Sequence, residues 1–407
     1  EHLLIQQLTA FYEVGSHNVY RLRGADWNDA LDMASERGES VAFTCAYAGN
    51  LRELASMIRL LESRSGEKEA VLAGELQILL NGDACLFEDP DAKNALLADY
   101  TQSCRHQISG GHFSISLSVL ADDLERRAGW LTGYLREQEW IDGGADEGWF
   151  NSYYDNHGRA VEGFFPNEVR MMLTGQVFSI MGNVASDEQI RRITASADHY
   201  LYRKEIGGYR LNTDFHELKF DMGRMFGFAY GEKENGAVFS HMTVMYGNAL
   251  YRRGFAKEGW KALKTLAETA LDFDTSRIYP GIPEYFRSDG RGMYHYLTGA
   301  ASWFMLTMIT QVFGVRGEAG DLIFAPRLMG EQFDSQGKAS VSLVFAGKQL
   351  EVIYENPEHK DSGEYTISSA ACEGYRLQTD SAGYAVLPRK VLDGFSGDHL
   401  RVTVTLN

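Results

Sequence analysis

The sequence is short of cysteine, and the few it has are badly spaced for a metal or redox site. Cys45, Cys85, Cys104 and Cys372 form no C-x-x-C pair or similar zinc-type spacing. This excludes the common structural zinc folds and predicts reduced thiols, as in a cytoplasmic protein.

Basic residues are also scarce, and long apolar runs are lacking. Lysine and arginine number 39 against 56 acidic residues, which gives a formal charge of -17 and a field that repels nucleic acid and anionic membranes. No apolar run reaches the ~18 residues of a membrane span, and residues 1–14 lack a signal-peptide pattern. We therefore expect neither nucleic acid nor membrane as a partner.

Several catalytic motifs are missing, namely the P-loop, the nucleophile elbow, H-E-x-x-H and the dinucleotide fingerprint. What is present is an ordinary globular composition, with 44% apolar residues, 12% aromatics and 42 glycines among 407 residues. The length predicts two or three domains, and the aromatics and glycines favour ring-lined clefts with tight turns.

Residues 1–320 have the apolar spacing of helices joined by glycine-rich loops. The clearest predicted helices cover 38–62, 113–138, 187–202, 241–253, 256–271 and 294–313. The segment 241–253 is apolar on nearly every side, whereas the next helix is amphipathic, an alternation expected of inner and outer helices in a double-layered helical barrel. The chain opens on Glu1 within a predicted helix, so we expect an N-terminal remainder of the same protein.

Residues 321–407 change to the period of two that is typical of strands. "KASVSLVFAG" and "HLRVTVTLN" alternate clearly, and the shorter "LEVIYEN", "EYTISSA" and "YAVLPRKVL" have strand length. This predicts a small antiparallel β module after a boundary near residue 320.

The stretch "RGADWNDALDMA" places a tryptophan among closely spaced acids. In a structural interpretation, Asp29 caps the following helix and Trp27 packs in the core. In a functional one, the ring of Trp27 stacks on a pyranose while a neighbouring carboxyl group, Asp26 or Asp29, protonates a glycosidic oxygen.

Two further stretches could bind an anion or a sugar. His241 in "ENGAVFSHMTVMY" is either a buried core histidine or a ligand. In "IYPGIPEYFRSDGRGMYHYLTGAASWF", Thr298 and Gly299 can offer a hydroxyl and an open backbone N–H to phosphate, or belong to a solvated loop with a helix-packing glycine. Glu284 and Tyr285 of the same stretch are candidate sugar contacts.

Three weaker candidates remain open. Arg210 in "GGYRLNTDF" either lines a polyhydroxyl site or belongs to a loop of turn formers, and Gln176 is either a sugar ligand or a satisfied buried amide. The stretch "WFNSYYDNHGRAVEG", residues 149–163, looks like an exposed aromatic-rich loop.

Taken together, "ADWNDALD", "ENGAVFSH", "GRGMYHYLTGAASW" and "FGVRGEAGDLIFAPRL", in this order, resemble glycoside hydrolase family 94, the inverting phosphorylases of β-linked glucosides. The resemblance runs over nearly the whole chain. It implies a mainly α fold: residues 1–320 as the second half of an (α/α)6 barrel, the catalytic portion, and residues 321–407 as the C-terminal β module.

The resemblance also implies roles. Asp29 becomes the catalytic acid, Trp27 a wall of the active site, and His241, Thr298 and Gly299 the phosphate ligands, with Asp26 supporting the loop. The substrates are a β-glucan oligosaccharide and inorganic phosphate, and no metal or organic cofactor is implied. Phosphate arrives already anionic, so a single acid suffices where an inverting hydrolase needs an acid and a base.

The sequence departs from family members specific for cellobiose after the phosphate histidine, where it reads "SHMTVMYGNALYRRG". In this and in "RIYPGIPEYF" it is most similar to the 1,2-β-oligoglucan phosphorylases, so β-1,2 linkages are the expected preference. Two alternatives stay open: an inverting hydrolase using a second carboxylate such as Asp214 or Glu284, and a non-catalytic glucan-binding fragment.

Overall fold

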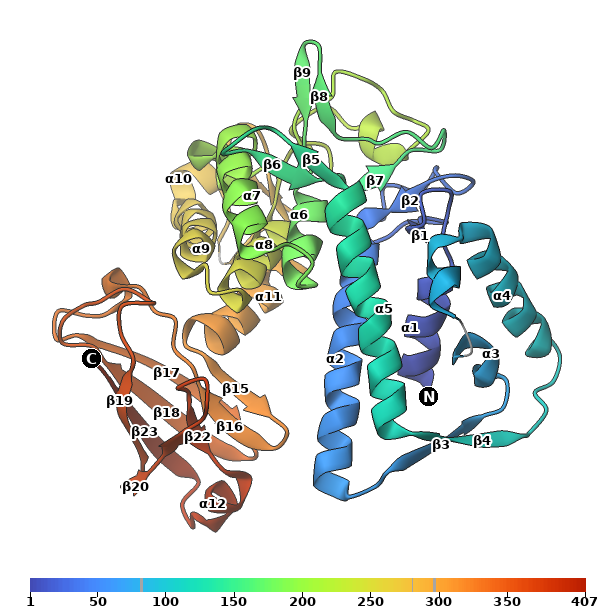
Figure 1. Ribbon diagram of the computed structural model, residues 1–407. Coiled ribbons are helices and arrows are strands. Elements are labelled where there is room, and N and C mark those ends of the chain that lie inside the picture. The colour runs from blue at the N-terminus through green and yellow to red at the C-terminus, as the bar shows by residue number, and fades with distance from the viewer. Residues whose placement is uncertain (81–82, 280, 296–297) are drawn as a thin grey trace. The chain divides into compact units, whose positions relative to one another are not determined.

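The computed structural model describes residues 1–80, 83–279, 281–295 and 298–407 (Figure 1). The chain divides into two compact units, residues 1–242 with 285–291 and residues 243–284 with 292–407. The domain boundary expected near residue 320 stays a prediction. The four cysteines are free thiols, and within the described ranges no helix combines the length and apolarity needed to cross a membrane.

The first unit is rich in helices. They are α1 (His2–Tyr12), α2 (Val41–Ser65), α3 (Leu76–Leu80), α4 (Pro90–Ser103), α5 (Leu117–Gln138), α6 (Leu173–Met181), α7 (Asp187–Tyr200) and the first turn of α8 (Ser240–Arg252), with 3-10 turns at Ala84–Glu88, Lys204–Ile206 and Arg224–Gly227.

The long helices α2 and α5 lie side by side (Figure 1). Helix α2 begins where Ser40 accepts the N–H of Phe43 and ends at Gly66, whose φ of 76° suits glycine. Helix α2 also packs against α6, where a Cβ on Gly49 would lie 2.7 Å from the Cα of Gly182, so glycines permit this close approach.

Short antiparallel strands connect these helices. They are β1 (Tyr20–Arg21), β2 (Glu39–Ser40) and β7 (Tyr153–Tyr154) in one sheet, and the pairs β3 (Glu69–Ala73) with β4 (His112–Ser116), β5 (Trp140–Asp142) with β6 (Gly148–Phe150), β8 (Gly163–Phe165) with β9 (Glu168–Arg170), β10 (Tyr202–Arg203) with β11 (Gly208–Tyr209), and β12 (Val238–Phe239) with β13 (Tyr285–Phe286). In the three-stranded sheet, Ser40 pairs with Tyr20 on one side and with Tyr153 on the other.

The second unit starts with helices and ends in two sheets. After the rest of α8 come α9 (Ala256–Leu271), α10 (Phe273–Ser276), β14 (Gly292–Met293), α11 (Gly299–Thr307) and a π-helical turn (Met308–Val312). One sheet has the order β15 (Val315–Glu318), β16 (Asp321–Phe324), β22 (Ala385–Leu387), β21 (Gln378–Thr379), and the other β17 (Lys338–Phe345), β18 (Lys348–Glu355), β23 (His399–Leu406), β19 (Ile367–Cys372), β20 (Tyr375–Arg376). A 3-10 turn (Gly330–Gln332) and helix α12 (Arg389–Gly394) complete the unit.

The helix-rich part and the strand-rich tail agree with the sequence predictions, and closure into a barrel stays a prediction. Helices were correctly expected at α2, α7, α8 and α9, and α7 is capped by Ser186, which accepts the N–H of Gln189. Two predicted helices were too long at their starts: residues 113–116 belong to β4, and α11 begins at Gly299. Residues 296 and 297 of the second prediction lie outside the described residues.

Two expectations about the tail were wrong in part. Strands β18 and β23 run parallel, so the module is not purely antiparallel. The predicted strand at 384–392 stops at Leu387, and α12 follows. Pro388 is the cause, since it lacks the N–H that a strand ladder needs and its φ of -62° suits the start of a helix.

Candidate active site

The loop with the D-W-N-D motif lies against the start of α8. The indole N–H of Trp27 donates a hydrogen bond of 3.3 Å to Nδ1 of His241, although 214 positions separate the two residues. The two ring centroids lie 5.6 Å apart, and the rings of Trp27 and Phe239 form a T-shaped contact with centroids 5.5 Å apart. The first unit therefore brings together the proposed sugar wall and one proposed phosphate ligand.

Asp26 connects this loop to neighbouring segments through hydrogen bonds. Its carboxylate accepts hydrogen bonds from the backbone N–H of Asn28 at 2.9 Å, the hydroxyl of Ser40 at 2.7 Å and the hydroxyl of Tyr153 at 3.1 Å. Burial raises the pKa of Asp26 to about 6, although these three hydrogen bonds favour the ionised form. Because Ser40 also caps α2, Asp26 ties the loop to a long helix and to β7.

Asp29, the expected acid, points to solvent. Its side chain is 79% exposed, and Oδ2 lies 3.3 Å from a guanidinium nitrogen of Arg224. The same guanidinium binds Asp32 at 2.5 Å, and the backbone N–H of Arg224 donates to Asp32 at 3.1 Å. Asp29 is thus accessible to a substrate and beside a fixed positive charge.

A second segment, residues 222–225, forms the support of the motif. The N–H of Met33 donates to the carbonyl of Met222 at 3.1 Å, and the N–H of Met225 donates to the carbonyl of Ala30 at 3.0 Å. Between them, a Cβ on Gly223 would lie 2.1 Å from the carbonyl oxygen of Ala30. Only glycine permits the two backbones to lie this close.

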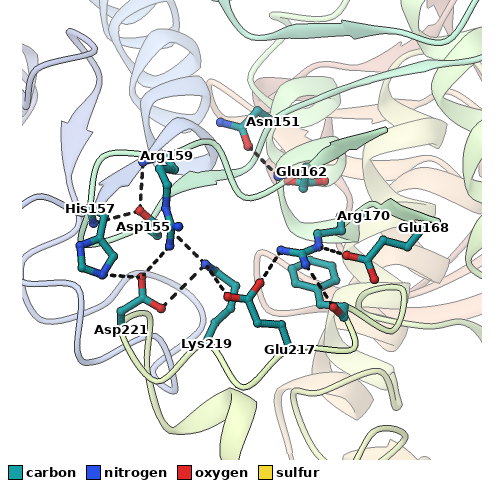
Figure 2. A network of polar contacts seen from close by, with 11 residues as sticks. Asn151, Asp155, His157, Arg159, Glu162, Glu168, Arg170, Glu217, Lys219 and Asp221 are labelled. Carbon is teal, nitrogen blue, oxygen red and sulfur yellow. Dashed lines mark hydrogen bonds and ion pairs between the residues drawn. The ribbon is translucent and has the colours of Figure 1, made fainter. Parts of the chain in front are cut away.

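The support segment is itself held by the polar network in Figure 2. Lys219, which is 3% exposed, binds the buried carboxylate of Asp155 at 3.0 Å, and Arg159 binds the same oxygen through Nε at 2.9 Å. Burial alone would raise the pKa of Asp155, but the hydrogen bonds from Arg159 and Lys219 lower it to about 2. Arg170 adds a hydrogen bond of 3.2 Å to the carbonyl of Phe215.

The three expected phosphate ligands are divided between the units. His241 is the second residue of α8 and belongs to the first unit, where burial lowers its pKa. Thr298 and Gly299 belong to the second unit, where Thr298 caps α11 by accepting the N–H of Ala300 at 3.2 Å and Gly299 is the first helical residue. The first N–H groups of a helix and its positive dipole end favour anions.

The remaining candidates have structural partners. The amide of Gln176 is fully buried, donates to the carbonyls of Phe150 and Met172 and accepts the N–H of Phe150, so the geometry favours the satisfied buried amide over a sugar ligand. Arg210 donates to the carbonyl of Gly236 and, at 3.3 Å, to the hydroxyl of Ser288.

Tyr285 and Glu284 fall on either side of the division between the units. Tyr285 is 3% exposed and stacks on Phe239 with ring centroids 6.3 Å apart, and its role as a sugar contact stays a prediction. Glu284 belongs to the second unit, and its backbone N–H donates to the carbonyl of Met293 at 3.1 Å.

Sequence reasoning missed Ser40, Tyr153 and Arg224. Tyr153 was hidden because residues 149–163 were interpreted as an exposed loop, and that interpretation was wrong: Trp149, Phe150 and Tyr153 are fully buried. The two pairs of adjacent rings in "WFNSYY" were the available signal, since aromatic residues are enriched in strands. The local sequence marks Ser40 only as a helix cap, and it gives no sign that Arg224 lies near the D-W-N-D motif.

Comparison with known proteins shows which enzyme families the chain is similar to. The catalytic-domain model of the glycosyl hydrolase 94 superfamily matches residues 124–314. This match and the curated relatives described below support a relationship between the chain and the glycosyl hydrolase 94 family. The matched stretch includes the anion candidates His241, Thr298 and Gly299, whereas the D-W-N-D loop precedes it.

Curated relatives are distant in sequence. The chain is 28% identical over 175 residues to cellobionic acid phosphorylase of Neurospora crassa, 24% over 190 residues to 3-O-beta-D-glucopyranosyl-beta-D-glucuronide phosphorylase of Paenibacillus borealis, and 23% over 336 residues to cyclic beta-(1,2)-glucan synthase NdvB of Rhizobium meliloti. These matches cover 40%, 44% and 79% of the chain but 22%, 24% and 10% of the relatives. The chain thus spans a quarter or less of the length of these relatives.

Among solved structures, a family GH92 alpha-mannosidase from Bacteroides thetaiotaomicron aligns with 11% identity and a TM-score of 0.28. The alignment covers all of the present chain and 48% of the mannosidase chain. A similarity this low supports no inference about function.

Proposed function

We propose that this protein carries out inverting phosphorolysis of β-linked glucooligosaccharides, with β-1,2 linkages preferred, and releases α-glucose 1-phosphate and a shortened glucan. Asp29 donates a proton to the leaving glycosidic oxygen, and the face of Trp27 supports the sugar ring. Phosphate attacks the anomeric carbon; its proposed ligands are His241 in the first unit and Thr298 and Gly299 in the second. Inorganic phosphate is a substrate, and we propose no metal or organic cofactor.

The contact between Trp27 and His241 carries the proposal. It joins the acidic loop to a helix N-terminus, an environment that favours an anion. A hydrolase would need a second carboxylate to activate water, whereas phosphate needs donors and positive potential at that position. A neutral N–H-bearing imidazole at a helix start is a suitable donor.

The β-1,2 preference rests on two observations. The sequence after His241 departs from the cellobiose-specific pattern, and the match to the cyclic beta-(1,2)-glucan synthase covers 79% of the chain. Both observations support a relationship to enzymes of β-1,2-glucans, and we therefore favour the β-1,2 linkage over β-1,3 and β-1,4.

The decisive experiment supplies inorganic phosphate with β-1,2, β-1,3 and β-1,4 glucooligosaccharides and measures glucose 1-phosphate and free glucose separately. We expect α-glucose 1-phosphate, formed fastest from the β-1,2 substrate. Release of glucose without phosphate would establish the hydrolase alternative, and binding of oligoglucan without any product would establish the binding fragment.

The acid is tested by Asp29→Asn, which keeps the size of the side chain and removes the proton donor. Phosphorolysis should fall by roughly 10²- to 10⁴-fold, the usual contribution of general acid catalysis. Asp214→Asn is the matched control, because Asp214 is the carboxylate that a hydrolase in this unit would use as base. Loss of activity in Asp214→Asn with little change in Asp29→Asn would reverse the assignment.

The phosphate site is tested at Thr298, with allowance for its structural role. Because its hydroxyl also caps α11, Thr298→Val removes both the cap and a phosphate donor, whereas Thr298→Ser keeps both. We expect Thr298→Val to weaken phosphate dependence by roughly 10- to 150-fold, the range for a hydrogen bond to a charged group, and Thr298→Ser to change it little. An unchanged phosphate dependence in Thr298→Val would remove this residue from the site.

A further inference from the structure

The hydrogen bond between Trp27 and His241 has a fixed direction. An indole N–H can only donate, so Nδ1 of His241 must be the acceptor in their 3.3 Å contact. A ring nitrogen that accepts carries no proton. In a neutral imidazole the proton therefore lies on Nε2.

The surroundings of His241 favour the neutral ring. The side chain is half-buried, and burial lowers its pKa because the charged form is poorly solvated there. The residue also lies in the first turn of α8, where the positive end of the helix dipole disfavours protonation of the imidazole. With the ring neutral, the direction of the Trp27 bond decides which nitrogen can donate.

The indole is held so that its N–H keeps this direction. Its ring packs against that of Phe239 in a T-shaped contact with an interplanar angle of 84°, and Phe239 pairs with Tyr285 across β12 and β13. On the other side, the hydrogen bonds to Asp26 fix the backbone that follows Trp27. Rotation of the indole away from His241 would disturb its contact with Phe239.

We propose that Trp27 is a positioning residue that holds His241 as the Nε2–H tautomer, so that Nε2 donates to the attacking phosphate. This inference deepens the proposed function and rests on it for the identity of the anion. The tautomer itself is a property of the chain and can be measured without any turnover. Trp27 thereby serves both substrates, the sugar through its ring face and phosphate through His241.

The first test reads the tautomer directly in the ¹⁵N-labelled 407-residue chain. Long-range ¹H–¹⁵N spectra distinguish protonated from unprotonated ring nitrogens, and His241→Gln identifies the signal of His241 by its loss. We expect a bare Nδ1 and a protonated Nε2 in the wild type, and averaged positions in Trp27→Phe, which keeps a ring and removes the N–H. A proton on Nδ1 in the wild type, or identical nitrogen shifts in Trp27→Phe, would overturn the proposal.

The second test measures the KM for inorganic phosphate in a double-mutant cycle of Trp27→Phe and His241→Gln. The Gln amide retains a donor near the position of Nε2 and offers no acceptor at that of Nδ1. Trp27→Phe alone should raise the phosphate KM by roughly 2- to 12-fold, the range for one hydrogen bond, with a smaller change in kcat. In the His241→Gln background the same change should have little further effect.

Trp260→Phe is the matched control. Its indole N–H also donates to a side chain, Glu331 at 2.5 Å, but Glu331 is not a proposed phosphate ligand, so phosphate KM should not change. An equal rise in phosphate KM from Trp27→Phe in both His241 backgrounds would refute the coupling. If the chain forms no glucose 1-phosphate at all, the proposed function fails, while the nitrogen shifts still decide the tautomer.

Discussion

Replacing Gly223 by alanine should displace the proposed catalytic loop by a predictable amount. The new Cβ would lie 2.1 Å from the carbonyl oxygen of Ala30, 2.6 Å from the N of Asp32 and 2.7 Å from the Cα of Leu31. All three are backbone atoms, which cannot turn aside as a side chain can. Since real Cβ contacts stay above 3.0 Å, the backbone at Ala30 must retreat by about 0.9 Å.

Ala30 directly follows the proposed acid, so this retreat is transmitted to Asp29. A misplacement of about 1 Å at a catalytic group costs roughly 100-fold in rate. Forcing extra volume into a packed contact also costs about 1–3 kcal/mol of stability. We expect Gly223→Ala to remain folded, with glucose 1-phosphate formation reduced roughly 100-fold and a modest loss in the free energy of unfolding measured with urea.

Gly227→Ala is the matched control, from the 3-10 turn Arg224–Gly227 that follows Gly223. Its nearest neighbour would be the Cε1 of Phe220 at 3.5 Å, an ordinary contact, so rate and stability should stay close to wild type. Equal rates in Gly223→Ala and Gly227→Ala would refute the view that the 222–225 segment positions Asp29.

Two further predictions concern buried charges. Lys219→Met should cost about 3 kcal/mol in urea unfolding, because it leaves the buried carboxylate of Asp155 without one of its cations. The pKa of Asp155 lies at about 2, below its ordinary value of 3.8, so its stabilisation is present above pH 4 and is lost as pH falls from about 4 to 2; Asp155→Asn should abolish that loss. Burial lowers the pKa of Lys93 to about 7 from 10.5, so wild-type stability should rise by roughly 2 kcal/mol between pH 7 and 9, and Lys93→Met should remove this rise.

Exposed charges provide the controls for both. Arg191→Met breaks a surface pair with Glu188 at 3.3 Å and should cost under about 1 kcal/mol. Lys68→Met removes a largely exposed cation and should leave the rise between pH 7 and 9 intact. A cost for Arg191→Met as large as that of Lys219→Met, or a wild-type stability independent of pH in this range, would contradict the reasoning.

Much of the local structure followed from short-range spacing in the sequence. The starts of α2 and α7 were readable because a serine cap and an apolar period of 3.6 act within a few residues. The D-W-N-D loop was identified as a candidate for the same reason, since its ring and acids are adjacent. Where the sequence misled, at Pro388 and at residues 149–163, the deciding influence was a single proline or burial by distant segments.

The identity of each partner in the site came from tertiary structure alone. Local sequence left Asp26 and Asp29 as equivalent acids, and the fold separated them by hydrogen-bonding the half-buried Asp26 to Ser40 and Tyr153 and leaving Asp29 79% exposed. Local sequence likewise left Gln176 open, until its amide met backbone groups 26 and four positions away.

The sequence by itself therefore determined which chemical groups are available and which helices and strands carry them, because propensity, capping and periodicity are local. Only the tertiary structure decided which groups are buried, which meet, and which nitrogen of His241 faces Trp27. Burial and hydrogen-bond direction depend on contacts between segments up to 214 positions apart, and no pattern within one segment encodes them.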